Sequence, residues 1–263
     1  MSTMQTEATD LPAVDGRTLP AVRLRAALAT MTVLRDRLAD PAPDRDLLTR
    51  IVETDPSMAL HLLAWANAQV APGEEIDTVA QALEVIDRWT VVALVDKLSV
   101  DALEAVPQLW RILARALSCQ QLTQDRRGYT VGLLSALGDL YGLPTGALVA
   151  TAGVSPLVAD AVLEHRGRLG AALGALLGYL ADDQALIARH GFDAQTVYDA
   201  YVQGATTAMT TQALMAERSA RAEGVVPATR IAQVPQPRSR EPRGDRASAP
   251  PAGAMASPAE EQR

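Results

Sequence analysis

The sequence predicts an all-α protein, folded as a compact orthogonal bundle of many helices. Hydrophobic residues make up 48% of its 263 residues, and they recur at helical spacing over most of the chain. Aromatic residues contribute only 3%, so a core must be built from Leu, Val, Ala and Met, of which Ala and Leu are strong helix formers. No segment alternates between apolar and polar residues as a half-buried strand would.

The helical pattern is nearly continuous between the two ends of the chain. The first expected helix carries apolar residues at helical spacing from Leu24 to Leu38 and ends at Asp40-Pro41. The other expected helices cover 44–54, Pro56 to the break at Pro72-Gly73, 76–86, 89–100, 107–122, 131–141, 144–152, 156–164, 169–180 and 194 to about 223, with a polar break at 125–128. This number of helices suits an orthogonal bundle better than a simple four-helix bundle.

One helix start has a specific capping signal. Asp55 precedes Pro56, which fits the first helical position because its missing N–H needs no partner there. The Asp55 carboxylate is expected to cap the helix, and its loss to cost about 1 kcal/mol. Asn67 lies at the other end, where its amide can bond exposed carbonyls or tolerate a left-handed conformation.

The two ends of the chain differ from the centre in composition. Residues 1–18 are expected to be a flexible lead-in, 19–224 the helical domain, and 225–263 a disordered tail rich in Pro, Arg and Ala. The tail has almost no large apolar residues, so it cannot offset the entropy cost of ordering. A solvated tail is favoured over a tether or a partner-binding segment.

Charge and cysteine content exclude several classes of protein. The net charge of −7 argues against a broad nucleic-acid-binding face, which needs clustered cations. The single cysteine, Cys119, permits neither an internal disulfide nor a cysteine zinc cluster, and its apolar context favours a buried, inert thiol. The polar, acidic N-terminus is not a secretory signal, and no apolar run reaches membrane-spanning length. We therefore expect a cytoplasmic protein without membrane contact.

The segment from Ile51 to Asp87 resembles the start of an HDOD domain, a bacterial signalling domain. That family shows an acidic-Pro helix start, a Leu-Leu pair, an Asn-small pair, and an Ala-Ile helix that ends in Leu-Gly. The corresponding positions are Asp55-Pro56, Leu62-Leu63, Asn67-Ala68, Ile76 and Ala82-Leu83, whereas Ile86-Asp87 departs from the closing Leu-Gly. The resemblance covers roughly residues 20–215 and is strongest to the HDOD half of EAL-HDOD proteins, without the EAL domain. It implies the compact helical bundle of the HDOD and HD type.

HDOD domains resemble the HD phosphohydrolases, whose defining helix carries a His-Asp metal-binding pair. In the matching stretch 132–138, the His position is Ser135 and the Asp position is Ala136. A hydroxyl and a methyl group cannot replace an imidazole and a carboxylate as metal ligands. An upstream histidine would fall near Ile112, which cannot ligate a metal. We therefore expect no catalytic residues, no metal ligands and no cofactor-binding residues.

The remaining polar residues offer weak alternatives. His61, His165 and His190 have no helical ligand partner four residues away, so capping or structural roles are favoured over a metal site. The adjacent carboxylates Asp182-Asp183 and Glu74-Glu75 diverge around a helix and are expected to be caps and solvated turns.

Arginines and tryptophans raise two further hypotheses. Arg126-Arg127, with Arg111 and Arg115, could form an anion-binding surface, although a solvated helix end is favoured. The tryptophans Trp65, Trp89 and Trp110 are expected to lie in the core or in a groove rather than to stack on a ligand.

Three functions are compatible with this sequence. A non-catalytic signal-transduction module acting through a protein partner is favoured, with a groove between Trp65 and Trp89 on one side and Ser135 and Tyr141 on the other. The alternatives are a nucleotide-sensing module and, less favoured, a residual metal-dependent phosphohydrolase with unusual ligands. The identity of a protein partner does not follow from the sequence.

The missing ligands generate a direct prediction. The purified protein should hold no stoichiometric divalent metal and should hydrolyse neither phosphodiesters nor nucleotides, because Ser135 and Ala136 stand where His and Asp are needed. Metal analysis and a hydrolysis assay with added manganese, iron or zinc test this. Bound metal at one per chain, together with turnover that a chelator abolishes, would show that other residues form a hydrolytic site.

Overall fold

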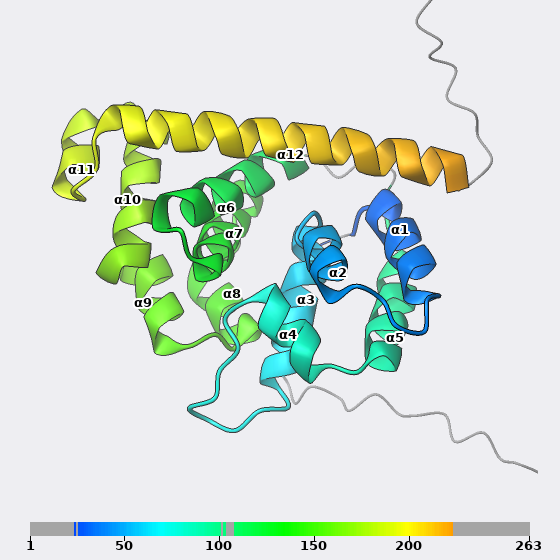
Figure 1. Ribbon diagram of the computed structural model, residues 1–263. Helices are drawn as coiled ribbons and strands as arrows, with labels where there is room; N and C mark the ends of the chain where they lie inside the picture. The colour runs from blue at the N-terminus through cyan, green and yellow to red at the C-terminus, as the bar shows by residue number, and fades with distance from the viewer. Residues whose placement is uncertain (1–23, 25, 101, 104–107, 223–263) are drawn as a thin grey trace, which may run out of the picture. The chain divides into compact units, whose positions relative to one another are not determined.

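The computed structural model describes residues 24, 26–100, 102–103 and 108–222. Within these ranges the chain forms twelve α-helices and no strand, which confirms the predicted all-α class (Figure 1). A single isolated bridge joins Ala27 and Leu103. The lead-in 1–18 and the tail 225–263 expected from the sequence lie outside the described residues. Among the described helices, none combines the length and the hydrophobicity that a membrane crossing needs.

The N-terminal helices come first in the chain and pack mainly on one another. Their bounds are α1 (Leu28–Leu38), α2 (Arg45–Val52), α3 (Pro56–Asn67), α4 (Val79–Val85) and α5 (Arg88–Ser99). Helix α1 contacts α2 and α5, and α3 contacts α2, α4 and α5.

The C-terminal helices are built around a central pair. Their bounds are α6 (Leu109–Thr123), α7 (Arg126–Tyr141), α8 (Thr145–Ala152), α9 (Pro156–Glu164), α10 (Gly167–Leu180), α11 (Gln184–Arg189) and α12 (Ala194–Ala222). Helices α6 and α7 pack against each other, and the long α12 lies along α6 and reaches α1 (Figure 1). Helix α12 therefore contacts both groups of helices.

Small residues let the central helices approach closely. A side chain at Gly132 of α7 would place its Cβ 2.6 Å from the backbone oxygen of Arg115 on α6. A Cβ at Gly204 of α12 would lie 2.5 Å from the Ser118 hydroxyl and 2.9 Å from the Ala114 carbonyl. Aliphatic side chains fill the surrounding core, where Tyr129 is the one large ring among the most deeply buried described side chains. Close backbone packing thus accompanies a core that is poor in rings.

Helices α1 and α4 begin later than the sequence predicts, each for a tertiary reason. The predicted first helix begins at Leu28 rather than Leu24, because the Ala27 N–H donates to Asp55 and the Leu28 N–H donates to the Leu103 carbonyl. Helix α4 begins at Val79 rather than Ile76, because Ile76 bonds the Asn67 amide and Thr78 caps the helix.

The break predicted at 125–128 is also shorter than expected. Asp125 caps α7 by accepting from the Arg127 N–H, so the helix begins at Arg126. Gly128 lies inside the helix against α6, where a Cβ would be 2.7 Å from the Cys119 carbonyl. Helix α11 was not predicted at all, because its six residues are too few to show a helical period.

Buried polar side chains join the N-terminal helices to the C-terminal ones. The Asn67 amide donates to the carbonyls of Ile76 and Ala152, each at 2.8 Å, and its oxygen accepts from the Ile76 N–H. Asn67 does bond exposed carbonyls, as the sequence suggested, but they belong to other segments and not to its own helix.

Asp77 forms the second part of this connection. Its two carboxylate oxygens accept from the N–H and the hydroxyl of Ser155, at 2.8 and 2.7 Å. The Thr130 hydroxyl of α7 donates to the Asp77 carbonyl at 2.6 Å. The segment between α3 and α4 is therefore held by α7, by the end of α8 and by the start of α9.

Asp55 makes two hydrogen bonds where the sequence predicted one. One oxygen accepts from the Met58 N–H at 2.9 Å, which is the expected helix cap. The other accepts from the Ala27 N–H at 2.6 Å, which fixes the chain just before α1. Asp55 is 1% exposed, and burial raises its pKa to about 6 against the lowering effect of these N–H donors.

We expect Asp55→Ala to destabilise the fold by about 2–4 kcal/mol, more than the single cap implies, because two buried N–H groups lose their acceptor. The matched control is Asp44→Ala, which removes the exposed cap of α2 and should cost about 1 kcal/mol. Urea denaturation of both variants measures the difference. Equal losses would show that the bond to Ala27 contributes nothing.

Candidate functional site

Ser135 and Ala136, the positions that the sequence comparison set against a metal-binding pair, lie on α7. Ala136 is fully buried, and Ile112 of α6 is 1% exposed within the core. Ser135 is half-buried, and its hydroxyl accepts a hydrogen bond from Nη1 of Arg115 at 3.3 Å. Within the described ranges, no three His, Cys, Asp or Glu side chains gather in a way that could hold a metal ion.

Arg115 places a permanent positive charge beside these positions. Its side chain is only 7% exposed, and Nη2 donates to Asp139, one turn beyond Ser135, at 2.8 Å. A guanidinium keeps its charge at any ordinary pH, and it offers donors but no lone pair to a cation. The seam between α6 and α7 is therefore closed by an arginine-aspartate pair, which is ill suited to binding a metal.

A small hollow lies where α3 begins, against α6 and α7. It is lined by Leu24, Asp55, Pro56, Ser57, Leu109, Ile112, Leu137 and Tyr141, and its volume of about 10 Å³ is room for roughly one water molecule. Tyr141 thus lies near the N-terminal helices, as the predicted groove required. The other predicted groove residues, Trp65, Trp89 and Ser135, do not line this hollow.

The tryptophans occupy three different environments. Trp65 is half-buried, and its indole Nε1 is buried without a hydrogen-bond partner among the described residues. Trp110 is 40% exposed and Trp89 is 71% exposed. The expectation that Trp89 lies in the core is therefore wrong. Val91, two positions later, is buried, so the Trp89 ring points to the opposite side of α5.

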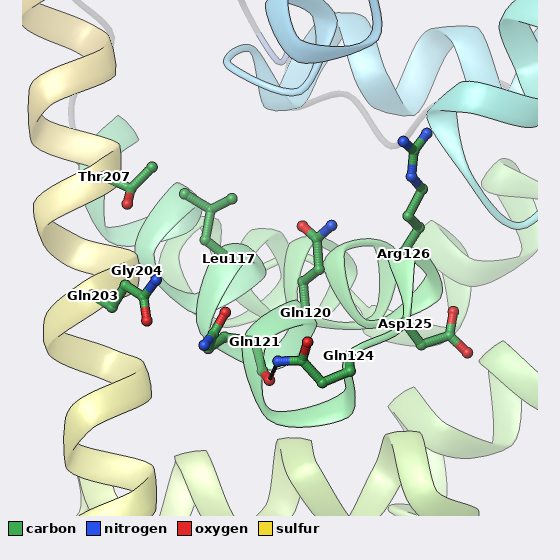
Figure 2. Close-up of a pocket in the computed structure, with 9 residues that line it drawn as sticks. All are labelled: Leu117, Gln120, Gln121, Gln124, Asp125, Arg126, Gln203, Gly204 and Thr207. Atoms are coloured by element: carbon green, nitrogen blue, oxygen red, sulfur yellow. Dashed lines mark hydrogen bonds between the residues drawn. The ribbon is translucent and has the colours of Figure 1, made fainter. Parts of the chain in front are cut away.

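A larger hollow lies between α6, the start of α7 and the middle of α12 (Figure 2). Its volume is about 370 Å³, within the range of small-molecule sites. Its lining is mostly polar and consists of Leu117, Gln120, Gln121, Gln124, Asp125, Arg126, Gln203, Gly204 and Thr207. The sequence analysis did not find this site, because Gln203 to Thr207 meet α6 only through the packing of α12. The adjacent glutamines at 120–124 were the one signal that could have indicated it.

Asp125 and Arg126 differ in how strongly each is paired with an opposite charge. Both oxygens of Asp125 accept from the Arg127 guanidinium, and these bonds hold the pKa of the Asp125 carboxyl below its usual value. Among the described residues, Arg126 makes one ion-pair contact, a long one of 3.9 Å with Asp46 of α2, between two exposed side chains. Such an exposed pair is weak, so the Arg126 guanidinium is available to another anion.

Arg126 also acts on Glu53, at the end of α2. Burial raises the pKa of the Glu53 carboxyl from its ordinary 4.5 to about 7, while the positive charge of Arg126 opposes this shift. The Glu53 carbonyl accepts from the Tyr129 hydroxyl of α7 at 2.7 Å. The C-terminal end of α2 is therefore coupled to α7 by the Tyr129–Glu53 hydrogen bond and by the electrostatic effect of Arg126 on Glu53.

The predicted arginine surface does not form as one patch. Arg115 is buried against Asp139, Arg127 pairs with Asp125, and Arg111 donates to Gln108 at 2.8 Å. Of the four arginines, only Arg126 lines the larger hollow. The structure thus replaces a broad anion-binding surface by a single arginine beside amide side chains.

The cysteine and the histidines have structural environments. Cys119 is fully buried, as expected from its apolar context, and burial raises the pKa of its thiol to about 12. Nδ1 of His61 lies 2.7 Å from the Ser57 carbonyl one turn earlier. His165 and His190 end α9 and α11, and their rings meet edge to face at 6.0 Å. The helix-end positions of these two residues match the sequence prediction.

The adjacent carboxylates also take local roles. Asp183 caps α11 by accepting from the Leu186 N–H at 2.9 Å, and Glu75 accepts from the Gly73 N–H in the turn before α4. Both observations agree with the caps and turns expected from the sequence.

Comparison with known proteins yields structural similarity only. No protein-family model matches the chain, and no curated protein sequence matches it. A solved structure of the MmoQ response regulator from Methylococcus capsulatus strain Bath is similar, with a TM-score of 0.53, 18% identity, 70% of this chain covered and 99% of that chain. A structure of its fragment 20–298 gives a TM-score of 0.51 and 18% identity, over 64% of this chain and 89% of that one. At this identity the similarity establishes a shared fold.

The coupling of Glu53 to Arg126 gives a prediction with a defined sign. Arg126→Gln should raise the pKa of Glu53 above 7, because the substitution removes the cation that opposes the effect of burial. A carboxyl ¹³C NMR titration measures this pKa, and Arg111→Gln is the matched control, since Arg111 bonds Gln108 instead. An unchanged Glu53 pKa in Arg126→Gln would contradict the coupling.

The same group shapes the pH dependence of stability. Its folded-state pKa lies above the ordinary value of 4.5, so the stability it contributes is complete below about pH 4.5 and is lost as the pH rises through 7. In Arg126→Gln this loss should begin at the same pH, be larger and continue to a higher pH, which urea denaturation across the pH range would detect.

Proposed function

We propose that this chain is a non-catalytic bacterial signalling module of the HDOD type, which acts in the cytoplasm by binding a protein partner. The observation that carries the proposal is the seam of α6 and α7, where Ser135 and Ala136 replace metal ligands and Arg115 bonds Ser135. A cation cannot share this position with a buried guanidinium without strong repulsion. The fold similarity to a response regulator supports a signalling role.

An exposed face of α5 is the best candidate surface for the partner. Trp89 and Val100 lie about three helical turns apart, so they share one side of the helix. They are 71% and 83% exposed, the two highest values among the large hydrophobic side chains that the structure describes. The Arg88 guanidinium lies 4.9 Å from the centre of the Trp89 ring, within the range of a cation–π contact. Tryptophan and arginine are enriched among the residues that dominate binding energy.

A second candidate function is nucleotide sensing, which the polar hollow beside α12 favours. Nucleotide sensing differs from partner binding in the kind of ligand, a small molecule instead of a protein. Neither function requires hydrolysis. A residual phosphohydrolase is not supported, because the side chains around Ser135 do not form a set of metal ligands.

The proposal is tested by capturing a partner with the tagged full-length chain from bacterial lysate and measuring its affinity for purified variants. Trp89→Ala should keep the circular dichroism spectrum and the melting temperature of the native chain, because the ring is exposed, and should weaken partner binding about tenfold or more. Trp110→Ala, which removes a ring at the start of α6, is the matched control and should keep full affinity. Full affinity of folded Trp89→Ala would refute the α5 surface, and hydrolytic turnover would refute the non-catalytic role.

A further inference from the structure

The larger hollow contains hydrogen-bonding groups that the protein itself leaves unused. Within the described part of the chain, the side chains of Gln120, Gln121, Gln203 and Thr207 make no hydrogen bond. Gln124 donates to the Gln121 carbonyl at 2.7 Å, which leaves its own carbonyl oxygen open. Each glutamine amide offers two donors and an acceptor. The hollow therefore presents paired donors and acceptors from two helices that are far apart in the sequence.

The hollow is polarised from one end to the other. Figure 2 shows Gln203 and Thr207 on α12 along one side, and Arg126 on the opposite side. Asp125 contributes little free negative charge, because both of its oxygens are engaged by Arg127. The site thus has an amide-lined neutral end and a cationic end. Leu117 supplies its apolar wall.

Close helix packing gives the hollow a fixed floor. Gly204 lies at the point where α12 approaches α6, and a Cβ there would clash with Ser118 and with the Ala114 carbonyl. On either side of this contact the glutamines of α6 and the polar residues of α12 project from rigid helices. Side chains on rigid elements lose less entropy on binding than side chains on loops.

We propose that this hollow binds a purine nucleotide, with the phosphate on Arg126 and the base edge on the glutamine amides. A glutamine amide pairs in bidentate fashion with the donor and acceptor edge of a purine, and an arginine guanidinium pairs with phosphate in the same way. The volume of about 370 Å³ admits a small ligand of this kind. This inference deepens the signalling function proposed above by naming a small-molecule input, and it rests on that function.

Arg126 connects this site to the N-terminal helices. Its contact with Asp46 of α2 is long and exposed, so a bound phosphate outcompetes it. Nucleotide binding then withdraws a positive charge from the surface of α2 near Asp46 and Glu53. This gives the ligand a physical route to α2 and, through its contacts with α1, to the remaining N-terminal helices.

The test is an NMR titration of the ¹⁵N-labelled full-length chain with AMP, with adenosine and with inorganic phosphate as separate probes. AMP should bind saturably, shift the amides of Gln120, Gln203 and Thr207, and also shift Asp46 on α2. Adenosine and phosphate should each bind about tenfold more weakly than AMP, because each uses only one end of the site. Phosphate binding as tight as AMP binding would overturn the assignment to a nucleotide, and so would the absence of saturable AMP binding.

Two variants locate the site. Arg126→Gln should weaken AMP binding about tenfold, the loss expected for a charge-assisted hydrogen bond, and should leave adenosine binding unchanged. Arg111→Gln, also on an exposed arginine but outside the hollow, should bind AMP like the native chain. Equal affinities of the two variants would overturn the placement of the phosphate. If AMP fails to bind while Trp89→Ala still loses its partner, this inference fails and the signalling function stands.

Discussion

The fold depends on a short buried segment, Ile76–Thr78, which connects the N-terminal helices to the C-terminal ones. Asn67 bonds Ile76 and the end of α8, and Asp77 bonds Ser155 and, through its carbonyl, Thr130 of α7. Such buried polar groups are costly when unpaired, so the two sets of helices can meet only in the arrangement that pairs all of them. Aliphatic packing alone would tolerate several arrangements. The hydrogen bonds around Asn67 and Asp77 therefore select one.

A second constraint is the close approach of α6, α7 and α12. The core has few rings to fill wide gaps, and glycines at 132 and 204 instead bring backbones into contact. Helix α12 contacts α6, α10, α11 and α1, so it links elements that the chain order separates. The same close contact at Gly204 leaves the polar hollow beside it. Packing of the helices thus creates the candidate ligand site as well as the core.

Two arginines divide the electrostatic roles of the C-terminal helices. Arg115 is buried, forms an ion pair with Asp139 and donates a hydrogen bond to Ser135. These interactions hold α6 against α7. Arg126 is exposed, weakly paired and close enough to oppose the raised pKa of Glu53. The first explains how the seam remains closed without a metal. The second places a weakly paired cation between the hollow and the carboxyl groups of Asp46 and Glu53.

The sequence by itself determined the all-α class, most helix positions, the Asp55 cap and the presence of a hydroxyl and a methyl group at Ser135 and Ala136. These features are local, because helical period, capping residues and the absence of a ligand can be read from neighbouring positions. Tertiary structure alone decided the starts of α1 and α4, the exposure of Trp89, the burial of Arg115 and the hollow beside α12. Four of these depend on a partner elsewhere in the chain: Leu103 for α1, Asn67 for α4, Asp139 for Arg115 and Gln203 for the glutamines of α6. Periodicity tells which residues can face a neighbour, but only packing decides which neighbour they face.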